Sequence, residues 1–83
     1  MLILRLTGSA ALALLSLAGW ERERISDALV LLTTDPRPPN ARRLTNLAGE
    51  AFEIWVGGER RVHYRVYKDD SGEDSVVMVF RVI

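Results

Sequence analysis

Residues 52–67, FEIWVGGERRVHYRVY, decide the fold, because two stretches of alternating side chains flank a pair of glycines. In residues 52–56, and again in residues 61–66, apolar side chains occupy every second position. This two-residue period is typical of a half-buried β-strand. The stretch therefore predicts a β-hairpin that turns at Gly57 and Gly58.

The length of the turn decides which side chains share a face of this hairpin. A two-residue Gly-Gly turn would pair Ile54 with Arg61 and mix apolar and charged side chains on both faces. A three-residue loop, Gly57 to Glu59, or a five-residue loop on the same register, pairs Ile54 with Val62. One face is then apolar and the other polar. The same register pairs Phe52 with Tyr64, Glu53 with His63 and Trp55 with Arg61.

Composition limits the classes of function. The 83 residues predict a single domain, residues 1–83, that buries about 60% of its unfolded surface. The absence of cysteine excludes disulfides and thiolate metal sites, and a single histidine argues against a zinc site. Eleven basic residues balance eleven acidic ones, so any nucleic-acid site must be local.

The uncharged residues 6–20 have the composition of a signal-peptide core, but other features favour a cytoplasmic protein without a membrane segment. Leu2, Leu4 and Leu6 alternate with other residues as in a strand, and the apolar run is too short to span a bilayer. Removal of residues 1–19 would also leave too little chain for the predicted core.

The remaining elements follow in chain order. Residues 2–7 predict a strand, and Ser9 is the expected N-cap of a helix that ends near Ala18. A second helix is expected from about Trp20 to Thr33, with Trp20 packed between the two helices and prolines after its end. Its apolar face combines Ile25, Ala28, Leu29 and Leu32.

A last strand is expected over residues 76–83, after a polar turn at residues 69–74. Apolar side chains occupy both of its faces, which predicts a position inside the sheet. The fold class is therefore α+β: a strand, a two-helix hairpin and three further strands. We expect a mainly antiparallel sheet with the helices packed on one face.

Three motifs resemble the RelE/ParE superfamily of bacterial toxins. They are LTTDPRP at residues 32–38, ARRL at residues 41–44 and GERRVHYRV at residues 58–66. The resemblance implies a toxin of a type II toxin–antitoxin module, held inactive by a cognate antitoxin and needing no cofactor. Nuclease members cut mRNA on the ribosome, and ParE members poison DNA gyrase.

The resemblance favours ribosome-dependent mRNA cleavage, with a gyrase poison or a truncated relic that only binds its antitoxin as alternatives. The chain departs from the family at several positions. Ribosome-dependent members usually carry Lys or Arg on the strand before the turn, where this chain has Glu53 and Trp55. The family's hairpin motif also has His and Val at the positions of Arg60 and His63. At Arg61 the chain keeps a residue of the family's hairpin motif.

Arg61 is the first candidate catalytic residue. A fixed guanidinium can neutralise the extra charge of the phosphorane formed during RNA cleavage. The alternative is a surface arginine stacked on Trp55, a cation–π pair that contributes about 0.5–1 kcal/mol. Both interpretations follow from the predicted register.

Glu53 and His63 are the second and third catalytic candidates. Placed opposite each other, a carboxylate and an imidazole can serve as general base and general acid in a metal-free transesterification. The alternative is a cross-strand ion pair on a solvated face, which contributes a few tenths of a kcal/mol. The candidates for RNA binding are Arg42, Arg43, Arg65, Arg81 and Trp55.

Overall fold

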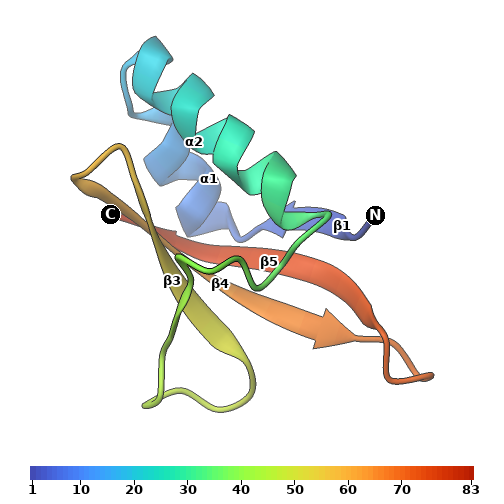
Figure 1. Cartoon of the computed structure of the whole chain (residues 1–83). Helices are drawn as coiled ribbons and strands as arrows, with labels where there is room; N and C mark the ends of the chain where they lie inside the picture. Colours follow the sequence, from blue (N-terminus) through green and yellow to red (C-terminus); the bar gives the residue numbers. More distant parts are fainter.

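The computed structural model describes residues 1–83 and contains two helices and a five-stranded sheet. Figure 1 shows β1 and the helices at the start of the chain and the remaining strands after them. The predicted α+β class is confirmed, with one strand, β2, that was not expected. The elements are β1 (Ile3–Leu6), α1 (Gly8–Leu15), α2 (Gly19–Leu32), β2 (Arg42–Arg43), β3 (Ala51–Val56), β4 (Arg60–Lys68) and β5 (Asp74–Val82).

The strands lie in the order β1-β5-β4-β3-β2. Only β1 and β5 are parallel, and every other neighbouring pair is antiparallel. The prediction of a mainly antiparallel sheet is thus confirmed. β5 lies inside the sheet, between β1 and β4, as predicted.

The hairpin of β3 and β4 has the predicted register. Ile54 pairs with Val62 and Trp55 with Arg61 across a turn over residues 57–59. Gly57 and Gly58 have φ angles of 68° and 88°, in the left-handed region that costs glycine little. The turn therefore places the alternating apolar residues of the hairpin on one face, as parity required. They are Phe52, Ile54, Val56, Val62, Tyr64 and Val66.

Both helices cover the same face of the sheet, and the core lies beneath them (Figure 1). Tyr64 and Val62 are fully buried there, and the ring of Phe52 stacks on Tyr64 with centroids 5.5 Å apart. From α2, the side chains at helical spacing point inward as predicted. The core comprises Ala10, Ile25, Leu29, Leu32, Phe52, Ile54, Val56, Val62, Tyr64, Val66, Val77 and Val79.

The ends of the helices differ from the sequence predictions. The N-cap of α1 is Thr7, whose hydroxyl accepts a hydrogen bond from the backbone N–H of Ala10 at 3.2 Å. Ser9 lies inside the helix, so the prediction that it caps α1 was wrong. α1 also ends at Leu15, before Ala18, with Ser16 as its C-cap, and Gly19 is the first residue of α2 instead of only separating the helices.

Trp20 does not pack between the helices, as the sequence had suggested. It is 65% exposed, with the Arg24 guanidinium 5.7 Å from its ring centre. Trp20 precedes the buried Leu29 by nine residues, about two and a half helical turns, so the two side chains leave opposite faces of α2. Because α1 ends at Leu15, it also lacks the last turn against which Trp20 was expected to pack.

Polar contacts of Pro36 and Arg37 hold the segment after α2 against the sheet. The buried hydroxyl of Tyr64 donates a hydrogen bond to the carbonyl oxygen of Pro36 at 2.7 Å. The Arg37 guanidinium bridges Asp74, at 2.6 Å, and Glu50, at 2.5 Å. These contacts direct the following residues along the edge of β3, where they form the short strand β2.

β5 contains an irregularity at Phe80. Val79 pairs with Tyr64 and Arg81 pairs with His63, so Phe80 is the extra residue of a β-bulge. In a regular strand Arg81 would share the core face with Val79. The bulge instead places Arg81 opposite His63, on the other face of the sheet.

The apolar residues near the N-terminus belong to the folded structure. β1 pairs with β5 along residues 3–6, and α1 packs over β5. Neither helix has the length and apolar character needed to cross a membrane.

Candidate functional site on the open face of the sheet

The face of the sheet that the helices leave uncovered carries a group of charged and aromatic side chains. β3 contributes Glu53 and Trp55, and β4 contributes Arg61 and His63. Glu53 lies directly opposite His63, and Trp55 lies directly opposite Arg61. Arg42 of β2 pairs with Glu53 and so lies on the same face. The alternation of the strands thus brings together the three catalytic candidates predicted from the sequence.

Glu53 and His63 form a close, shielded pair. His63 Nε2 donates a hydrogen bond to Glu53 Oε2 at 2.8 Å, and the two side chains are only 13% and 10% exposed. This hydrogen bond, reinforced by the charges of Arg61 and Arg42, lowers the pKa of Glu53 despite its burial. Glu53 is therefore a carboxylate at neutral pH, in contact with a second group that can exchange protons.

Arg61 connects this pair to Trp55. Its guanidinium carbon lies 5.2 Å from the centre of the indole ring, and its Nη1 lies 3.9 Å from Glu53 Oε2. The Arg61 side chain remains 39% exposed, and Trp55 is 51% exposed. The two interpretations of Arg61 are thus compatible: the guanidinium stacks on the indole and still faces solvent beside a carboxylate.

A hollow of about 320 Å³ opens beside this group, and we call it the Trp55 hollow. It lies between the hairpin and the residues of β2 and the loop after it. Arg43 pairs with Phe52, which faces the core, but the Arg43 side chain still reaches the hollow. His63 is not part of the lining. Neither Arg42 nor Arg43 forms an ion pair within 4 Å. The lining residues are Arg42, Arg43, Leu44, Thr45, Asn46, Glu53, Trp55 and Arg61.

Arg65 and Arg81, the other arginines considered for RNA binding, lie outside this hollow. Arg65 Nη1 donates a hydrogen bond to the carbonyl oxygen of Ala48, and its guanidinium lies 5.2 Å from the ring centre of Phe80. Arg81 is exposed and pairs with His63. The two arginines extend the positively charged surface from the hairpin toward β5.

Several residues at this site were not expected from the sequence. Leu44, Thr45 and Asn46 line the hollow from a loop, which has no periodicity to reveal its position. Phe80 lies with its ring centre 6.0 Å from that of His63 and so helps to enclose the imidazole. Phe80 is the extra residue of the bulge in β5, which the alternation of the strand does not predict.

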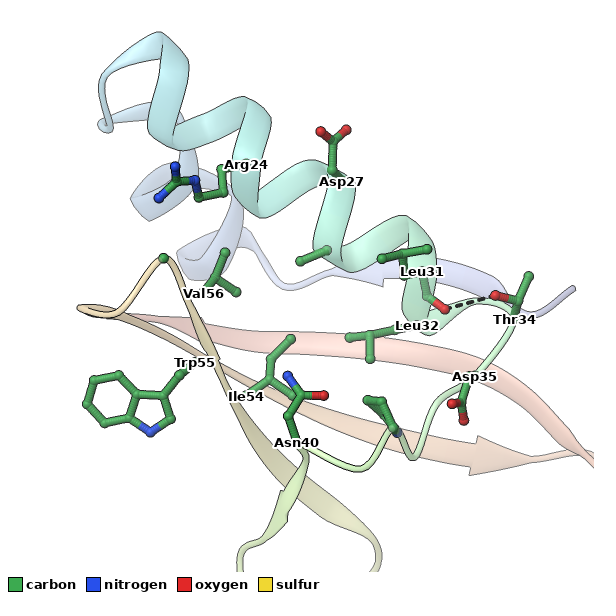
Figure 2. Close-up of a pocket in the computed structure, with 13 residues that line it drawn as sticks. Arg24, Asp27, Leu31, Leu32, Thr34, Asp35, Asn40, Ile54, Trp55 and Val56 are labelled. Atoms are coloured by element: carbon green, nitrogen blue, oxygen red, sulfur yellow. Dashed lines mark hydrogen bonds between the residues drawn. The ribbon is translucent and has the colours of Figure 1, made fainter.

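A larger hollow, of about 560 Å³, lies between α2, β3 and the segment after α2. Figure 2 shows Ile54 and Val56 pointing into it and the indole of Trp55 directed away from it. Arg24 and Asp27 stand at its rim, and no two of its ionisable side chains form an ion pair. Its apolar walls suit a partner surface better than acid–base chemistry. Nowhere do His, Asp and Glu side chains gather in a group of three that could hold a metal ion.

Two solved structures share this fold over nearly its whole length. A chain of the crystal structure of the intact E. coli RelBE toxin–antitoxin complex is 23% identical with a TM-score of 0.80, and the match covers 99% of this chain and 94% of that one. A double arginine-to-alanine mutant of the E. coli toxin RelE in the free state is 24% identical with a TM-score of 0.75, covering 98% and 80%. No protein-family model matches the sequence, and no curated protein sequence matches it. The chain therefore has the RelE fold, which confirms the resemblance at the level of the fold.

Proposed function

We propose that this protein is a RelE-like toxin that inhibits growth by cleaving mRNA on the ribosome. The observation that carries the proposal is the arrangement of Glu53, His63 and Arg61 on the open face of a RelE fold. A carboxylate, an imidazole and an accessible guanidinium within one cluster are the groups that RNA transesterification requires.

The chemistry assigns one role to each of these residues. Glu53 accepts the proton of a ribose 2′-hydroxyl, whose oxygen forms a bond to the adjacent phosphorus. The guanidinium of Arg61 offsets the additional negative charge of the phosphorane. The bond from phosphorus to the 5′-oxygen then breaks, and His63 returns a proton to that oxygen. The products are a 2′,3′-cyclic phosphate and a free 5′-hydroxyl.

A cognate antitoxin is the proposed protein partner. The similar E. coli structure is a toxin–antitoxin complex, and both helices of this chain carry large apolar side chains that are exposed. Exposed apolar side chains that gather in a patch commonly mark a binding site for another protein. The exposed apolar residues of the two helices are Leu12, Leu15, Trp20, Val30 and Leu31.

The test is primer extension on ribosome-bound mRNA from E. coli cells before and after induction of the protein. We expect cuts after induction, and a rate about 10²–10³-fold lower for Arg61→Ala, by analogy with the loss of one oxyanion donor. His63→Gln should also slow cleavage, because an amide cannot supply a proton. Arg5→Ala is the matched control. Arg5 is exposed on the same face of the sheet, but it lies in β1, at the opposite edge of the sheet from the hairpin that carries Glu53, Arg61 and His63.

The outcomes separate the competing functions. Growth arrest without mRNA cuts would contradict the nuclease and favour a gyrase poison. Cuts that persist in Arg61→Ala would contradict the assignment of the active site. Normal growth and soluble protein in the absence of an antitoxin would contradict a toxin, whereas growth arrest that is relieved by the protein encoded next to this one would support a toxin.

A further inference from the structure

The Trp55 hollow combines one aromatic surface with several cationic groups. Trp55 is 51% exposed, and the Arg61 guanidinium lies over its ring. Exposed aromatic side chains beside arginines are the usual platform on which unpaired nucleic-acid bases stack. An indole serves any base, because every base presents a π-face.

The charge of the hollow favours an anion. Three guanidinium groups, from Arg42, Arg43 and Arg61, line it together with a single carboxylate, that of Glu53. Arg42 and Arg43 have no ion-pair partner, so their charges remain available to a ligand. The hollow is thus locally positive in a chain with no net charge. Phosphate oxygens are the ligands that such arginines commonly bind.

The size and the rim of the hollow fit one nucleotide. Its volume of about 320 Å³ lies at the lower end of the range of small-ligand pockets. Thr45 and Asn46 stand at its rim with side chains that form no hydrogen bond within the protein. A hydroxyl and an amide supply both donors and acceptors for the edge of a base.

We propose that the Trp55 hollow binds a single unstacked nucleotide of single-stranded RNA, with its base against the indole and its phosphate held by Arg42 and Arg61. The proposal rests on the function proposed above and adds the place where the substrate is held. The base enters from the open face, and the neighbouring phosphodiester then lies beside Glu53. A base that remains stacked in a duplex has no access to the indole, so the hollow selects unpaired RNA.

The first measurement uses the fluorescence of Trp55 alone. The chain has two tryptophans, so Trp20→Phe leaves Trp55 as the single indole. The probe is a 2′-O-methyl RNA hexanucleotide, which cannot be cleaved because its nucleophile is blocked. We expect saturable quenching by the single strand at low salt and at least tenfold weaker binding of the same sequence as a duplex. Equal binding of the two forms would overturn the proposal.

The second measurement compares affinities by the anisotropy of the labelled hexanucleotide. Trp55→Leu should weaken binding about 5- to 150-fold, the range that corresponds to one lost base stack. Trp20→Leu, the matched change of the other exposed tryptophan, should leave the affinity unchanged. Arg42→Ala should make the slope of log affinity against log salt shallower by about 0.7, as expected for one phosphate contact on a single strand.

These results are distinguishable from a failure of the proposed function. Unchanged affinity in Trp55→Leu, together with unchanged mRNA cuts in cells, would contradict nucleotide binding in the Trp55 hollow but would still support mRNA cleavage. Binding with the predicted Trp55 dependence, but without any cuts, would support the hollow and contradict cleavage. Circular dichroism of Trp55→Leu confirms that a lost affinity is not a lost fold.

Discussion

Replacing Tyr64 by phenylalanine tests how the segment between α2 and the hairpin is held. The hydroxyl of Tyr64 is fully buried and donates a hydrogen bond to the carbonyl oxygen of Pro36 at 2.7 Å. The substitution keeps the ring and therefore its stacking on Phe52, but it leaves a buried acceptor without its donor. Such a loss costs about 1–3 kcal/mol of unfolding free energy.

Urea denaturation measures this cost directly. We expect a lower midpoint with an unchanged slope, because the surface exposed on unfolding stays the same. Each kcal/mol corresponds to a fall of about 4–8 °C in the melting temperature of a domain of this size. The matched control is Tyr67→Phe in the same strand, since Tyr67 is half exposed and its hydroxyl forms no hydrogen bond.

The pH dependence gives an independent check of the same substitution. Burial raises the pKa of Tyr64 to about 12, whereas the unfolded value is near 10. The folded state therefore loses stability as the pH rises from about 10 through 12, where the unfolded tyrosine is already ionised. Tyr64→Phe should remove this loss. Equal stabilities of Tyr64→Phe and Tyr67→Phe, at neutral and at alkaline pH, would refute the reasoning.

Two further predictions concern the ion-pair cluster and the hairpin turn. The hydrogen bonds from Arg37 lower the pKa of Asp74, so the stability that this carboxylate contributes is lost as the pH falls below its unfolded value of about 3.9. The urea midpoint should therefore fall less between about pH 5 and pH 2.5 in Arg37→Gln than in the wild type, and an equal fall would contradict this. Gly57→Ala should cost about the 1–2 kcal/mol of a left-handed residue, because the Arg24 guanidinium near the new Cβ is the end of an exposed, flexible side chain that can move aside. Gly58→Ala, with nothing within 4 Å, should cost about the same, and thermal melts that show a much larger loss for Gly57→Ala would contradict the reasoning.

The hairpin shows how much of the site the sequence determines. Strands have a strict period of two, so parity alone placed Glu53, Trp55, Arg61 and His63 on one face, and the structure agrees. Helix spacing identified the buried side of α2 for the same reason. The parts that could not be predicted have no period: a two-residue strand, a loop and a bulge.

The consequences of these missed features are specific. Asn46 lines the hollow from the loop after β2, and this loop follows a segment that is held by contacts of Pro36 and Arg37. The bulge at Phe80 reverses the face of Arg81, and the alternation of β5 up to that point gives no sign of it. Trp20 was misplaced because the length of α1 determines whether it has a neighbour, and helix ends are poorly marked in an alanine- and leucine-rich segment.

The pairing of β1 with β5 has a consequence for synthesis. The first strand, residues 3–6, has its partner among residues 76–79, so the sheet closes only when almost the entire chain is available. A contact between positions so distant in sequence is slow to form, because its entropic cost is met before any neighbouring contact assists it. While the last strand is still within the ribosome's exit tunnel, β1 has no partner and α1 no strand to cover. β1 and α1 therefore reach their places in the fold only after residues 76–79 have left the tunnel, and until then both segments are open to capture by chaperones.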